Sequence, residues 1–575
     1  MTKPARSHRL VPAVSVALAL IAGVLPATAS GVTDPAIAEP AVAGGTLDTV
    51  AAMQPSWNLG NTLDAIPDET SWGNPLADKA LFDTLRSQGF HSVRIPVTWG
   101  GHQSTTAAYP IDQPFLTRVK QVVDWALADD LSVVLNLHHD SWQWIADMPA
   151  NHDVVRARFD ATWTQIASTF KDTSSKLLFE SVNEPSFTNA TDNRKTELIN
   201  ELNTSFHSIV RASGGENTTR LLVLPTLGSA PDAAAMDNLA GTMASLNDPA
   251  LVATVHFYGF WPFSVNIAGY TRFDSATQQD MINAFTLMRT KFVAKGIPVY
   301  LGEYGLLSYP DYTKPASVER GEALKYFEML GEQARTNGVT TALWDAGSFI
   351  NRNTLQWRDP VLIDTVKSSW DTRSGTASSD SLFVPKSGAL PARTLTLNLN
   401  GTTFQELRQG GTSLVPGRDY TVAGDQLTLT APALTRLAGD RTYGVNATLQ
   451  ASFSQGVPWQ IDVITYDPPA VSNASGTIGS FALPTEFHGD RLATMEAKYG
   501  DGGNAGPADW TSYQEFNASF SPNYEAGTIA LTRGFLDTLK EGVPVTLTFH
   551  FWSGGTAKYS VTRSGESVTG TTSGS

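Results

Sequence analysis

Residues 177–187 read LLFESVNEPSF, a stretch that joins a buried strand to a polar end. Its first part is a continuous apolar run, which is typical of a strand covered on both faces of a sheet. Asn183 and Glu184 follow directly, and Pro185 ends the stretch of regular pattern. Because a carboxylate beside buried apolar surface is costly unless it is paired or used, neighbouring strands should end in polar groups that meet Glu184.

Eight runs of this kind alternate with helical patterns across residues 46–370. They read SWNLG near 56, HSVRIP from 91, SVVLNLH from 132, LLFESV from 177, RLLVLP from 220, LVATVHF from 251, PVYLGE from 298 and VTTALWD from 339. Apolar residues recur at helical spacing between most of them, for example in residues 114–130 and 317–336. This order predicts an α/β fold, a parallel (β/α)8 TIM barrel. An open doubly wound sheet is the alternative, but no GxGxxG motif follows the first strand.

The composition indicates a large globular protein and favours a neutral ligand. At 575 residues the chain is too long for one domain, and 41% hydrophobic with 17% charged residues can build large cores. The net charge of -15 disfavours nucleic acid, which binds basic surfaces. The 14 Trp, 15 Tyr and 26 Phe either pack in cores or form flat platforms for sugar rings. With no Cys, the fold depends on neither disulfides nor thiolate metal sites.

The N-terminal residues have the pattern of a secretory signal peptide. Lys3, Arg6 and Arg9 precede an apolar segment, and the small residues Ala-Thr-Ala follow it at 27–29. The apolar segment is too short for a comfortable membrane span. We therefore expect cleavage of residues 1–29 and export of a secreted, extracellular protein that has no membrane partner.

The chain changes character after residue 370. A Ser/Thr/Gly-rich connector, DTRSGTASSDS, precedes segments that alternate like strands, and a second break, YDPPAVSNASG, begins at Tyr466. The segments on either side of this break match each other, because GDQLTLTAPALTRL from 424 and GTIALTRGFLDTL from 527 place Leu and Ile at equivalent positions. We expect two small all-β, immunoglobulin-like sandwiches at 382–466 and 470–575.

Polar and aromatic residues stand at the ends of six of the eight predicted strands. In a (β/α)8 barrel the C-terminal ends of the strands form the face that carries the active site. Singly, each of these residues could be a packed or paired core residue, but their common placement predicts one active site. In chain order they are Arg94, His138, His139, Asn183, Glu184, His256, Tyr258, Glu303 and Trp344.

Glu184 and Glu303 form the pair of carboxyl groups that retaining glycoside hydrolysis requires. One protonates the leaving oxygen, and the other, about 5 to 5.5 Å away, attacks the anomeric carbon. We expect burial and the charge of Glu303 to raise the pKa of Glu184, whereas Arg94 should keep Glu303 ionised. Pro185 should hold Glu184 in an extended conformation. Gly302 should allow close approach of substrate or of a neighbouring strand.

Five motifs in the barrel region resemble those of glycoside hydrolase family 5. They are NEP at 183–185, HFY at 256–258, GEYG at 302–305, VRIPVTW at 93–99 and SWNLGNTLDA from 56. The last motif, together with ETSWGNP from 69, is similar to subfamily 4, which is rich in endoglucanases and xyloglucanases, although Ser56 stands where the family often has Gly. The resemblance implies Glu184 as acid/base and Glu303 as nucleophile.

The resemblance also implies a shell of residues around the two glutamates. Its members are Arg94, His138, Asn183, His256, Tyr258 and Trp344. Asn183 can bond the sugar 2-hydroxyl, and Trp344 can stack against a sugar ring. Candidates for more distant sugar subsites, each nearly as well explained by packing, are Asn61, Trp72, Trp99, Trp142 and Trp261. His138 and His139 could suggest a metal, but no HExxH motif or acidic set accompanies them, so we expect neither metal nor cofactor.

The two C-terminal segments resemble an X2 module and a family 46 carbohydrate-binding module. LATMEAKYGDGGNAGPADWTSYQEF and TFHFWSGG carry the second match. In such a module an aromatic side chain can stack on the flat face of a glucan. We expect Trp552 in that role. Trp510 is the second candidate, although we expect it to pack in the core. The short joints predict that the last module lies near the barrel cleft, where it raises the effective substrate concentration or extends the groove.

The sequence as a whole predicts a secreted, monomeric, retaining endo-β-1,4-glucanase, a cellulase. Its expected partner is a β-glucan: cellulose, mixed-linkage glucan and, in a broader hypothesis, xyloglucan. A dedicated xyloglucanase or a β-mannanase is the alternative within the fold, because these enzymes share the catalytic set and differ in their loops. A non-catalytic glucan-binding protein is the alternative of another class, but it predicts loss of one glutamate and both are present.

Overall fold

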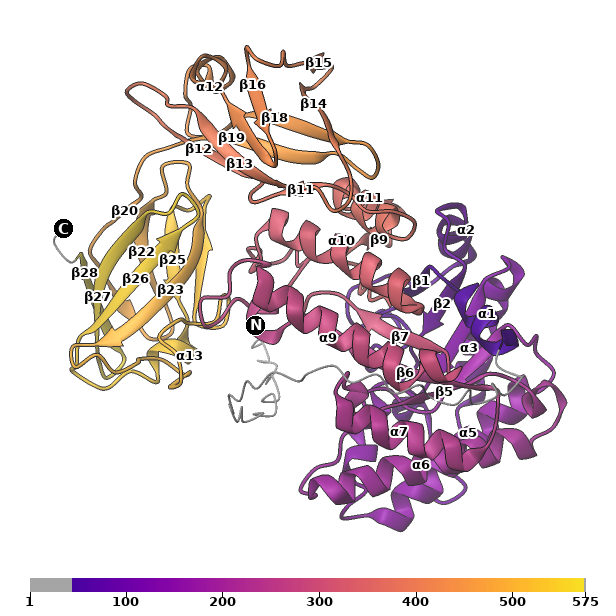
Figure 1. Cartoon of the computed structure of the whole chain (residues 1–575). Coiled ribbons are helices and arrows are strands. Elements are labelled where there is room, and N and C mark those ends of the chain that lie inside the picture. Colours follow the sequence, from indigo (N-terminus) through magenta and orange to yellow (C-terminus); the bar gives the residue numbers. More distant parts are fainter. Residues whose placement is uncertain (1–43, 573–575) are drawn as a thin grey trace, which may run out of the picture. The chain divides into compact units, whose positions relative to one another are not determined.

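The N-terminal region of the chain is a closed barrel of eight parallel strands. The computed structural model describes residues 44–572, so the predicted signal peptide at 1–29 lies outside the described residues. β1 pairs with both β2 and β8, which closes the barrel in chain order (Figure 1). The strands are β1 (Ser56–Asn58), β2 (Ser92–Ile95), β3 (Ser132–Asn136), β4 (Leu177–Glu180), β5 (Leu222–Pro225), β6 (Leu251–Phe257), β7 (Val299–Tyr304) and β8 (Val339–Leu343). The predicted TIM barrel is therefore confirmed.

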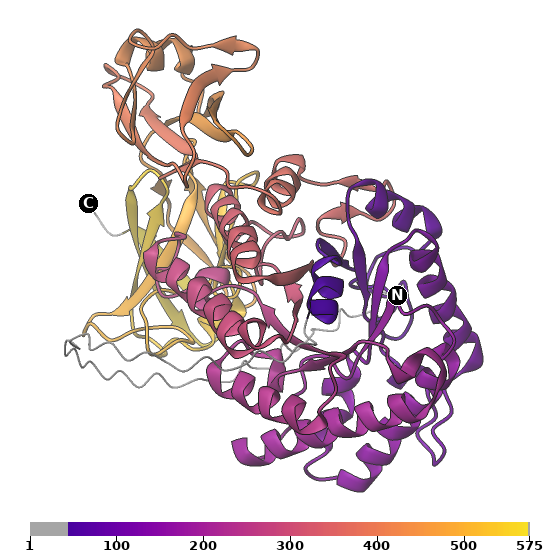
Figure 2. The same ribbon diagram turned by 45° about the vertical axis from the view of Figure 1, so that its right-hand side comes forward.

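Helices cover the outside of the barrel (Figure 2). The longer ones are α2 (Lys79–Ser87), α3 (Gln113–Ala128), α5 (His152–Phe170), α6 (Asp192–Ala212), α7 (Ala233–Leu246), α9 (Ser275–Lys291), α10 (Arg320–Asn337) and α11 (Pro360–Ser369). Side-chain caps explain where several begin, since Asp78, Asp232 and Asp274 each accept a hydrogen bond from the first turn of the helix that follows.

Shorter elements complete the catalytic region. They are α1 (Gly44–Ala51), α4 (Asp140–Gln143), α8 (Trp261–Ser264), the 3-10 turns η1 (Gly100–His102), η2 (Ile145–Asp147), η3 (Gly215–Thr218), η4 (Leu227–Ser229) and η5 (Val293–Lys295), and the hairpin of β9 (Ile350–Asn351) and β10 (Gln356–Trp357). The described residues belong to one compact unit. None of their helices combines the length and the hydrophobicity that a membrane span requires.

Side-chain alternation along the strands separates an outer core from an inner one. Leu177 and Phe179 of β4 belong to the outer core, whereas Leu178 joins the cluster inside the barrel. The inner cluster comprises Val50, Met53, Val134, Leu178, Val223, Val252, Tyr300 and Ala342. Because side chains two residues apart share a face, Glu180 points into the barrel next to this apolar layer. It begins the polar layer on which the site is built.

An irregularity in β7 brings Glu303 beside His256. β6 pairs Val255 with Leu301 and then His256 with Glu303, so Gly302 is an extra residue in β7. A Cβ atom at Gly302 would lie 3.0 Å from His256 Nε2. The predicted close approach of a neighbouring strand at Gly302 is therefore observed.

Two all-β modules follow the barrel, and each is built from two sheets. In each, one sheet has four strands and the other has five: β11-β13-β17-β16 with β12-β19-β18-β14-β15, then β20-β22-β25-β24 with β21-β28-β27-β26-β23. A short helix, α12 (Ala431–Ala438) or α13 (Arg533–Leu536), follows the equivalent strand in each module. This structural repeat explains why the two segments match in sequence.

The strand bounds of the two modules are as follows. The first module contains β11 (Thr376–Ala377), β12 (Ser381–Pro385), β13 (Arg393–Asn398), β14 (Phe404–Gln409), β15 (Thr412–Ser413), β16 (Tyr420–Ala423), β17 (Gln426–Leu429), β18 (Gly444–Phe453) and β19 (Trp459–Tyr466). The last module contains β20 (Ala470–Val471), β21 (Ala474–Thr477), β22 (Phe481–Glu486), β23 (Leu492–Tyr499), β24 (Phe520–Asn523), β25 (Thr528–Leu531), β26 (Val545–Phe551), β27 (Thr556–Ser564) and β28 (Ser567–Thr572).

Candidate active site

Arg94 lies at the centre of the polar layer and uses all five of its N–H donors. Nε and Nη2 each donate a hydrogen bond of 2.7 Å to the carboxylate of Glu180. Nη1 donates to Glu303 Oε1 at 2.8 Å and to Asn58 Oδ1 at 3.1 Å, and Nη2 also donates to Asn183 Oδ1 at 2.8 Å. Burial opposes the charge, but the two carboxylates raise the pKa of Arg94 above its usual range. The guanidinium therefore remains charged.

Glu180 belongs to the site, although the sequence pattern did not single it out. Its side chain is fully buried and makes a two-point pair with Arg94. Burial opposes ionisation, yet the charge and hydrogen bonds of Arg94 lower the pKa of Glu180. The apolar run LLFESV conceals this residue, but its position two places after Leu178, facing the barrel interior, is the signal that could have revealed it.

Glu303 is almost fully buried and is held by two donors. Tyr258 donates to Oε2 at 2.7 Å, and Arg94 donates to Oε1. Burial raises the pKa of Tyr258 well above its usual range, so the phenol remains a donor. Burial also raises the pKa of Glu303, and His256 and Arg94 offset this only in part. The predicted lowering effect of Arg94 is therefore present, but burial, together with the charge of Glu184, outweighs it.

Glu184 lies at the open side of the site and is paired with His256. Its side chain is 46% exposed, and Oε1 is 2.8 Å from His256 Nδ1. Burial would raise the pKa of Glu184, but the hydrogen bond and charge of His256 outweigh it and lower that pKa. Burial opposes protonation of His256, yet Glu303 and Glu184 raise its pKa. The prediction of a raised pKa for Glu184 is therefore wrong for the free site, because the sequence did not show that His256 faces it.

The backbone at Glu184 is left-handed, with φ at 38°. The prediction that Pro185 holds Glu184 extended is therefore wrong. A positive φ is uncommon for a non-glycine residue. Hydrogen bonds on both sides fix the turn: Asn183 N donates to Leu137 O at 2.8 Å, and Gly228 N donates to Pro185 O at 2.7 Å. In this conformation Asn183 and Glu184, though adjacent in sequence, both reach active-site partners. The strain is thus located where two successive side chains serve one site.

The two glutamates approach each other closely. Glu184, His256 and Glu303 each place a ligating atom within 4.8 Å of the other two. His256 Nδ1 is also 3.6 Å from Glu303 Oε2. The carboxyl oxygens are thus near the separation of about 5 to 5.5 Å found in retaining glycosidases and well below the roughly 6.5 to 9.5 Å of inverting ones.

A second cluster also has the spacing of a metal site. It consists of Asp64, His138 and His139, whose ligating atoms lie within 4.8 Å of one another. Both Asp64 oxygens accept backbone N–H groups, from Asn61 and Thr62. His139 Nε2 lies 3.4 Å from Asp64 Oδ2. The Asp64 carboxylate therefore stabilises a loop, whereas His139 Nε2 has no hydrogen-bond partner among the described residues. The absence of a metal stays a prediction.

His138 and Trp344 form one wall of the site. Their rings stack, with centroids 5.5 Å apart and planes 7° from parallel. Asn136 Nδ2 lies 3.2 Å from His138 Nδ1, and a donor at that nitrogen leaves the proton on Nε2, 3.9 Å from Glu303 Oε1. Burial lowers the pKa of His138 well below its usual range. A neutral imidazole N–H therefore faces the nucleophile candidate.

Three family models match successive regions of the chain. The cellulase model, glycosyl hydrolase family 5, matches residues 59–349, carbohydrate binding domain X2 matches 377–463, and the family 46 carbohydrate binding domain matches 467–571. Endoglucanase B of Paenibacillus lautus is 47% identical over 576 residues, covering 99% of this chain and 100% of that protein. The chain belongs to glycosyl hydrolase family 5.

Solved structures of trimodular family 5 enzymes extend the likeness to nearly the whole chain. The endo-β-1,4-glucanase B of Bacillus halodurans is 45% identical with a TM-score of 0.90, over 92% of this chain and 99% of that one. An endo-β-1,4-glucanase of subfamily 4 from Bacillus licheniformis is 32% identical with a TM-score of 0.77, over 89% and 99%. The resemblance to a family 5 enzyme with an X2 and a family 46 module is therefore confirmed.

The distant aromatic candidates of this family 5 enzyme fall into two groups. Trp99 is fully buried, so it is a core residue. Trp72 and Trp142 are exposed and adjoin the active site through His139: the Trp72 ring lies 5.1 Å from the His139 ring, and Trp142 Nε1 donates to His139 Nδ1 at 2.9 Å. Asn61 contributes to the loop beside the site through its backbone, because its N–H donates to the carboxylate of Asp64.

The two tryptophans of the last module differ from expectation. Trp510 is 57% exposed, and its ring lies 6.5 Å from that of Trp261, itself exposed at the start of α8. Its expected place in the core is therefore wrong. Trp552 is partly buried, and the Arg272 guanidinium lies 4.9 Å from its ring. Trp510 thus presents the larger free surface, since Arg272 covers one side of Trp552.

The last module contacts the loops that follow β6 and β7. Asn266 Nδ2 donates to Ser317 O at 2.7 Å and to Ala493 O at 2.9 Å. The Asn266 carbonyl accepts from Phe516 N at 3.1 Å. Asn266 thus links both barrel loops to the module. Because these loops follow the strands that carry two active-site residues, the module borders the catalytic face.

Proposed function

We propose that this family 5 enzyme is an endo-β-1,4-glucanase that cleaves internal bonds of cellulose and mixed-linkage β-glucan with retention of configuration. The approach of Glu184 and Glu303 to within 4.8 Å at the catalytic end of the barrel carries the proposal. That separation suits direct attack by one carboxylate and leaves no room for a water between the two. The likeness to an endoglucanase at 47% identity supports the substrate class.

In the first step Glu303 attacks the anomeric carbon while Glu184 protonates the glycosidic oxygen. The bond from the anomeric carbon to the leaving sugar breaks, an ester to Glu303 forms, and the proton passes to the departing hydroxyl. Tyr258 and Arg94 each hold one oxygen of Glu303. The nucleophile is therefore oriented before the substrate arrives, which removes an entropic part of the barrier.

The proton for this step is held between His256 and Glu184 in the free site. A bound sugar covers the exposed Glu184 carboxyl and removes water from it, which raises its pKa. The proton then moves from His256 Nδ1 to Glu184 Oε1 across their 2.8 Å contact. Glu184 thus acts as an acid when substrate is bound, although its pKa is low without substrate.

In the second step water hydrolyses the ester to Glu303. Glu184, now a carboxylate, takes a proton from the water, whose oxygen bonds the anomeric carbon as the bond to Glu303 breaks. Asn183 Oδ1 is occupied by Arg94, so its Nδ2 remains to donate to the sugar 2-hydroxyl. This bond strengthens toward the transition state, and Trp344 offers the stacking surface beside it.

The alternatives concern the loops and the modules. A dedicated xyloglucanase or a β-mannanase would use the same catalytic residues. The same residues would also allow a glucanase to cleave xyloglucan in addition to cellulose and mixed-linkage glucan. A non-catalytic glucan-binding protein is disfavoured, because both glutamates and their donors are in place. The last module extends the cleft through Trp510, which adjoins Trp261 and offers an apolar face to a glucan chain.

Secretion is the second part of the proposal. The charged start, apolar segment and Ala-Thr-Ala at 27–29 support cleavage after residue 29. The mature protein is then an extracellular monomer without a membrane or nucleic-acid partner. N-terminal sequencing of protein recovered from culture medium should begin at Ser30, and an intact leader on the exported protein would contradict this.

Turnover on four polysaccharides tests the proposed activity. We expect hydrolysis of carboxymethylcellulose and mixed-linkage glucan with a rapid fall in viscosity, the mark of internal cleavage, and slower or no hydrolysis of mannan. Xyloglucan is included because activity on xyloglucan alone would indicate a dedicated xyloglucanase, whereas activity on all three glucans would indicate a glucanase of broad specificity. Glu303→Ala is the control, and substantial activity in that variant would overturn the nucleophile assignment.

A further inference from the structure

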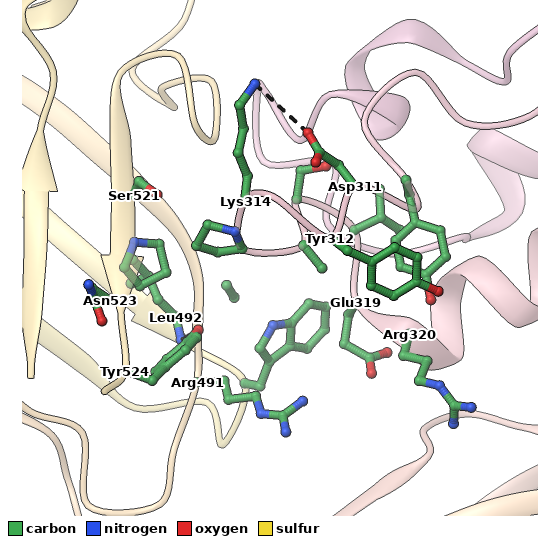
Figure 3. Close-up of a pocket in the computed structure, with 18 of the residues that line it drawn as sticks. Asp311, Tyr312, Lys314, Glu319, Arg320, Arg491, Leu492, Ser521, Asn523 and Tyr524 are labelled. Atoms are coloured by element: carbon green, nitrogen blue, oxygen red, sulfur yellow. Dashed lines mark hydrogen bonds and ion pairs between the residues drawn. The ribbon is translucent and has the colours of Figure 1, made fainter. Parts of the chain in front are cut away.

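A large pocket lies between the barrel and the last module, outside the active site. It has a volume of about 1140 Å³. One wall is the segment of residues 309–320 between β7 and α10, and the other includes Phe487, residues 489–493 and 521–525, and Trp552 of the last module (Figure 3). Neither catalytic glutamate is among its lining residues. We call it the interface pocket.

Aromatic side chains line both walls of the interface pocket. Tyr312 of the barrel loop is 54% exposed, and Tyr524 of the module is 43% exposed. Figure 3 shows them on opposite sides of the pocket. Trp552 lines it too, although Arg272, which covers the ring at 4.9 Å, does not. Exposed aromatic faces in a hollow suit the apolar faces of pyranose rings.

The pocket also contains a buried acceptor without a donor. Asp490 is almost fully buried, and its Oδ1 accepts from the backbone N–H groups of Arg491 and Ser553. Among the described residues, its Oδ2 has no hydrogen-bond partner. An unpaired buried acceptor is unfavourable, and burial raises the pKa of Asp490, which favours a carboxyl that keeps its proton.

The charges of the pocket favour a neutral ligand. Lys314 lies 3.8 Å from Asp311, so that lysine is already paired. Arg320 is likewise paired, with Asp359 at 2.9 Å. The other ionisable lining residues are mainly acidic: Glu319, Asp490, Glu525 and Arg491. Burial raises the pKa of Glu319 and of Asp490, which favours their neutral forms. Among the lining residues Arg491 is then the one cation left for an anionic ligand, whereas a polyhydroxylated neutral ligand would meet hydrogen-bonding groups and aromatic faces.

We propose that the interface pocket binds a segment of a neutral β-glucan chain, as a site separate from the catalytic cleft. The ligand class rests on the proposed glucanase function and on the carbohydrate-binding family of the module. The volume exceeds the roughly 300–1,000 Å³ of small-molecule pockets and suits several linked sugar units. Since each wall belongs to a different part of the chain, bound glucan also stabilises the contact between barrel and module.

Hydrogen exchange on the full-length Glu303→Gln protein tests this site. With cellohexaose we expect slower exchange in two places: the cleft segments around residues 138–144 and 256–261, and the pocket segments 309–315 and 521–525. Protection of the cleft without protection of the pocket would overturn the proposal and leave the glucanase function intact. Protection of neither would count against both.

Variants of the two walls locate the effect. Trp552→Ala and Tyr312→Ala should each abolish protection of the pocket segments and keep protection of the cleft. Val422→Ala, at an exposed position of β16 in the X2 module, is the control and should keep both. Because Tyr312 is exposed on a barrel loop, its substitution tests the pocket even if Trp552→Ala fails to fold. Pocket protection that survives Tyr312→Ala and a folded Trp552→Ala would contradict the assignment.

Discussion

At the scale of single residues, Arg94 divides one positive charge between two carboxylates. Two of its donor contacts go to Glu180 and one to Glu303. Glu180 thereby limits how far Arg94 can stabilise the ionised form of Glu303. The raised pKa of Glu303 in the free site follows from burial that this shared charge does not offset.

Glu180→Gln should therefore lower the pKa of Glu303. Removing the negative charge leaves Arg94 uncompensated, which favours ionised Glu303, so the acidic limb of kcat/KM against pH should move to lower pH. Because the buried guanidinium loses one of its two charged partners and keeps Glu303, the free energy of unfolding should fall by about 1 to 3 kcal/mol. The measurements are a pH profile and urea unfolding.

Glu197→Gln is the matched control, because Glu197 pairs with Arg194 on the exposed surface of α6. It should leave the pH profile unchanged and alter stability by no more than about 0.5 kcal/mol. An acidic limb of Glu180→Gln that stays in place or moves to higher pH would contradict the role given to Glu180.

The sequence predicted which residues meet in the site better than it predicted their electrostatics. Glu184, Glu303 and Arg94 could be placed because strand ends of a closed barrel converge. The pairing of Glu184 with His256 and of Arg94 with Glu180 depends on side-chain directions that spacing alone leaves open. The contact with His256 reversed the predicted pKa shift of Glu184, and burial outweighs the predicted effect of Arg94 on the pKa of Glu303.

At the scale of elements, the extra residue in β7 sets the position of the nucleophile candidate. Gly302 lies between Leu301 and Glu303, which pair with successive residues of β6. Its carbonyl accepts a hydrogen bond from Asn58 Nδ2 at 2.9 Å. The eight strands themselves were predictable, because continuous apolar runs with helices between them leave few alternatives. The left-handed turn at Glu184 was not, since Pro185 favours an extended residue before it and only the surrounding hydrogen bonds override that preference.

Gly302→Ala should reduce kcat much more than it reduces substrate affinity. The new Cβ would meet His256 Nε2 at 3.0 Å and the Thr254 hydroxyl at 2.8 Å, so β7 must shift and carry Glu303 with it. A displacement of about 1 Å can cost roughly a hundredfold in rate. Steady-state kinetics on mixed-linkage glucan measure this.

Gly241→Ala in α7 is the control for the same substitution. A Cβ there meets nothing within 4 Å, so kcat should be unchanged and stability should rise by about 0.5 to 1 kcal/mol. A Gly302→Ala enzyme with unaltered kcat would show that the close contact between β6 and β7 does not position Glu303.

At the scale of the whole molecule, Asn266 connects the catalytic region to the last module. Its side chain bonds both the barrel loop after β7 and a strand of the module, and its φ of 54° suits Asn better than most residues. The sequence indicated a nearby module through its short joints, but the link through Asn266 lies in a loop with no recognisable pattern. The exposure of Trp510 was likewise visible only in the structure.

Asn266→Ala should loosen the module and weaken the binding of long substrates. Two hydrogen bonds are lost, each worth about 1 kcal/mol, so hydrogen exchange in β23 should accelerate and KM for polymeric glucan should rise. The kcat on a short aryl cellobioside should stay the same, because the glutamates do not move. Deletion of residues 470–575 gives the limiting value, and unchanged kinetics on every polymer in that truncated protein would show that the module plays no part in the cleft.

The central claim is that Glu303 forms a covalent ester with the sugar while Glu184 supplies and recovers the proton. Incubation with a 2-deoxy-2-fluoro cellobioside that carries a good leaving group tests it most directly, because the fluorine slows hydrolysis of the ester and allows it to accumulate. After proteolysis, mass spectrometry should find the added sugar on Glu303, and product analysis by NMR should show retained configuration. A label on any other residue, or hydrolysis with inversion, would contradict the account.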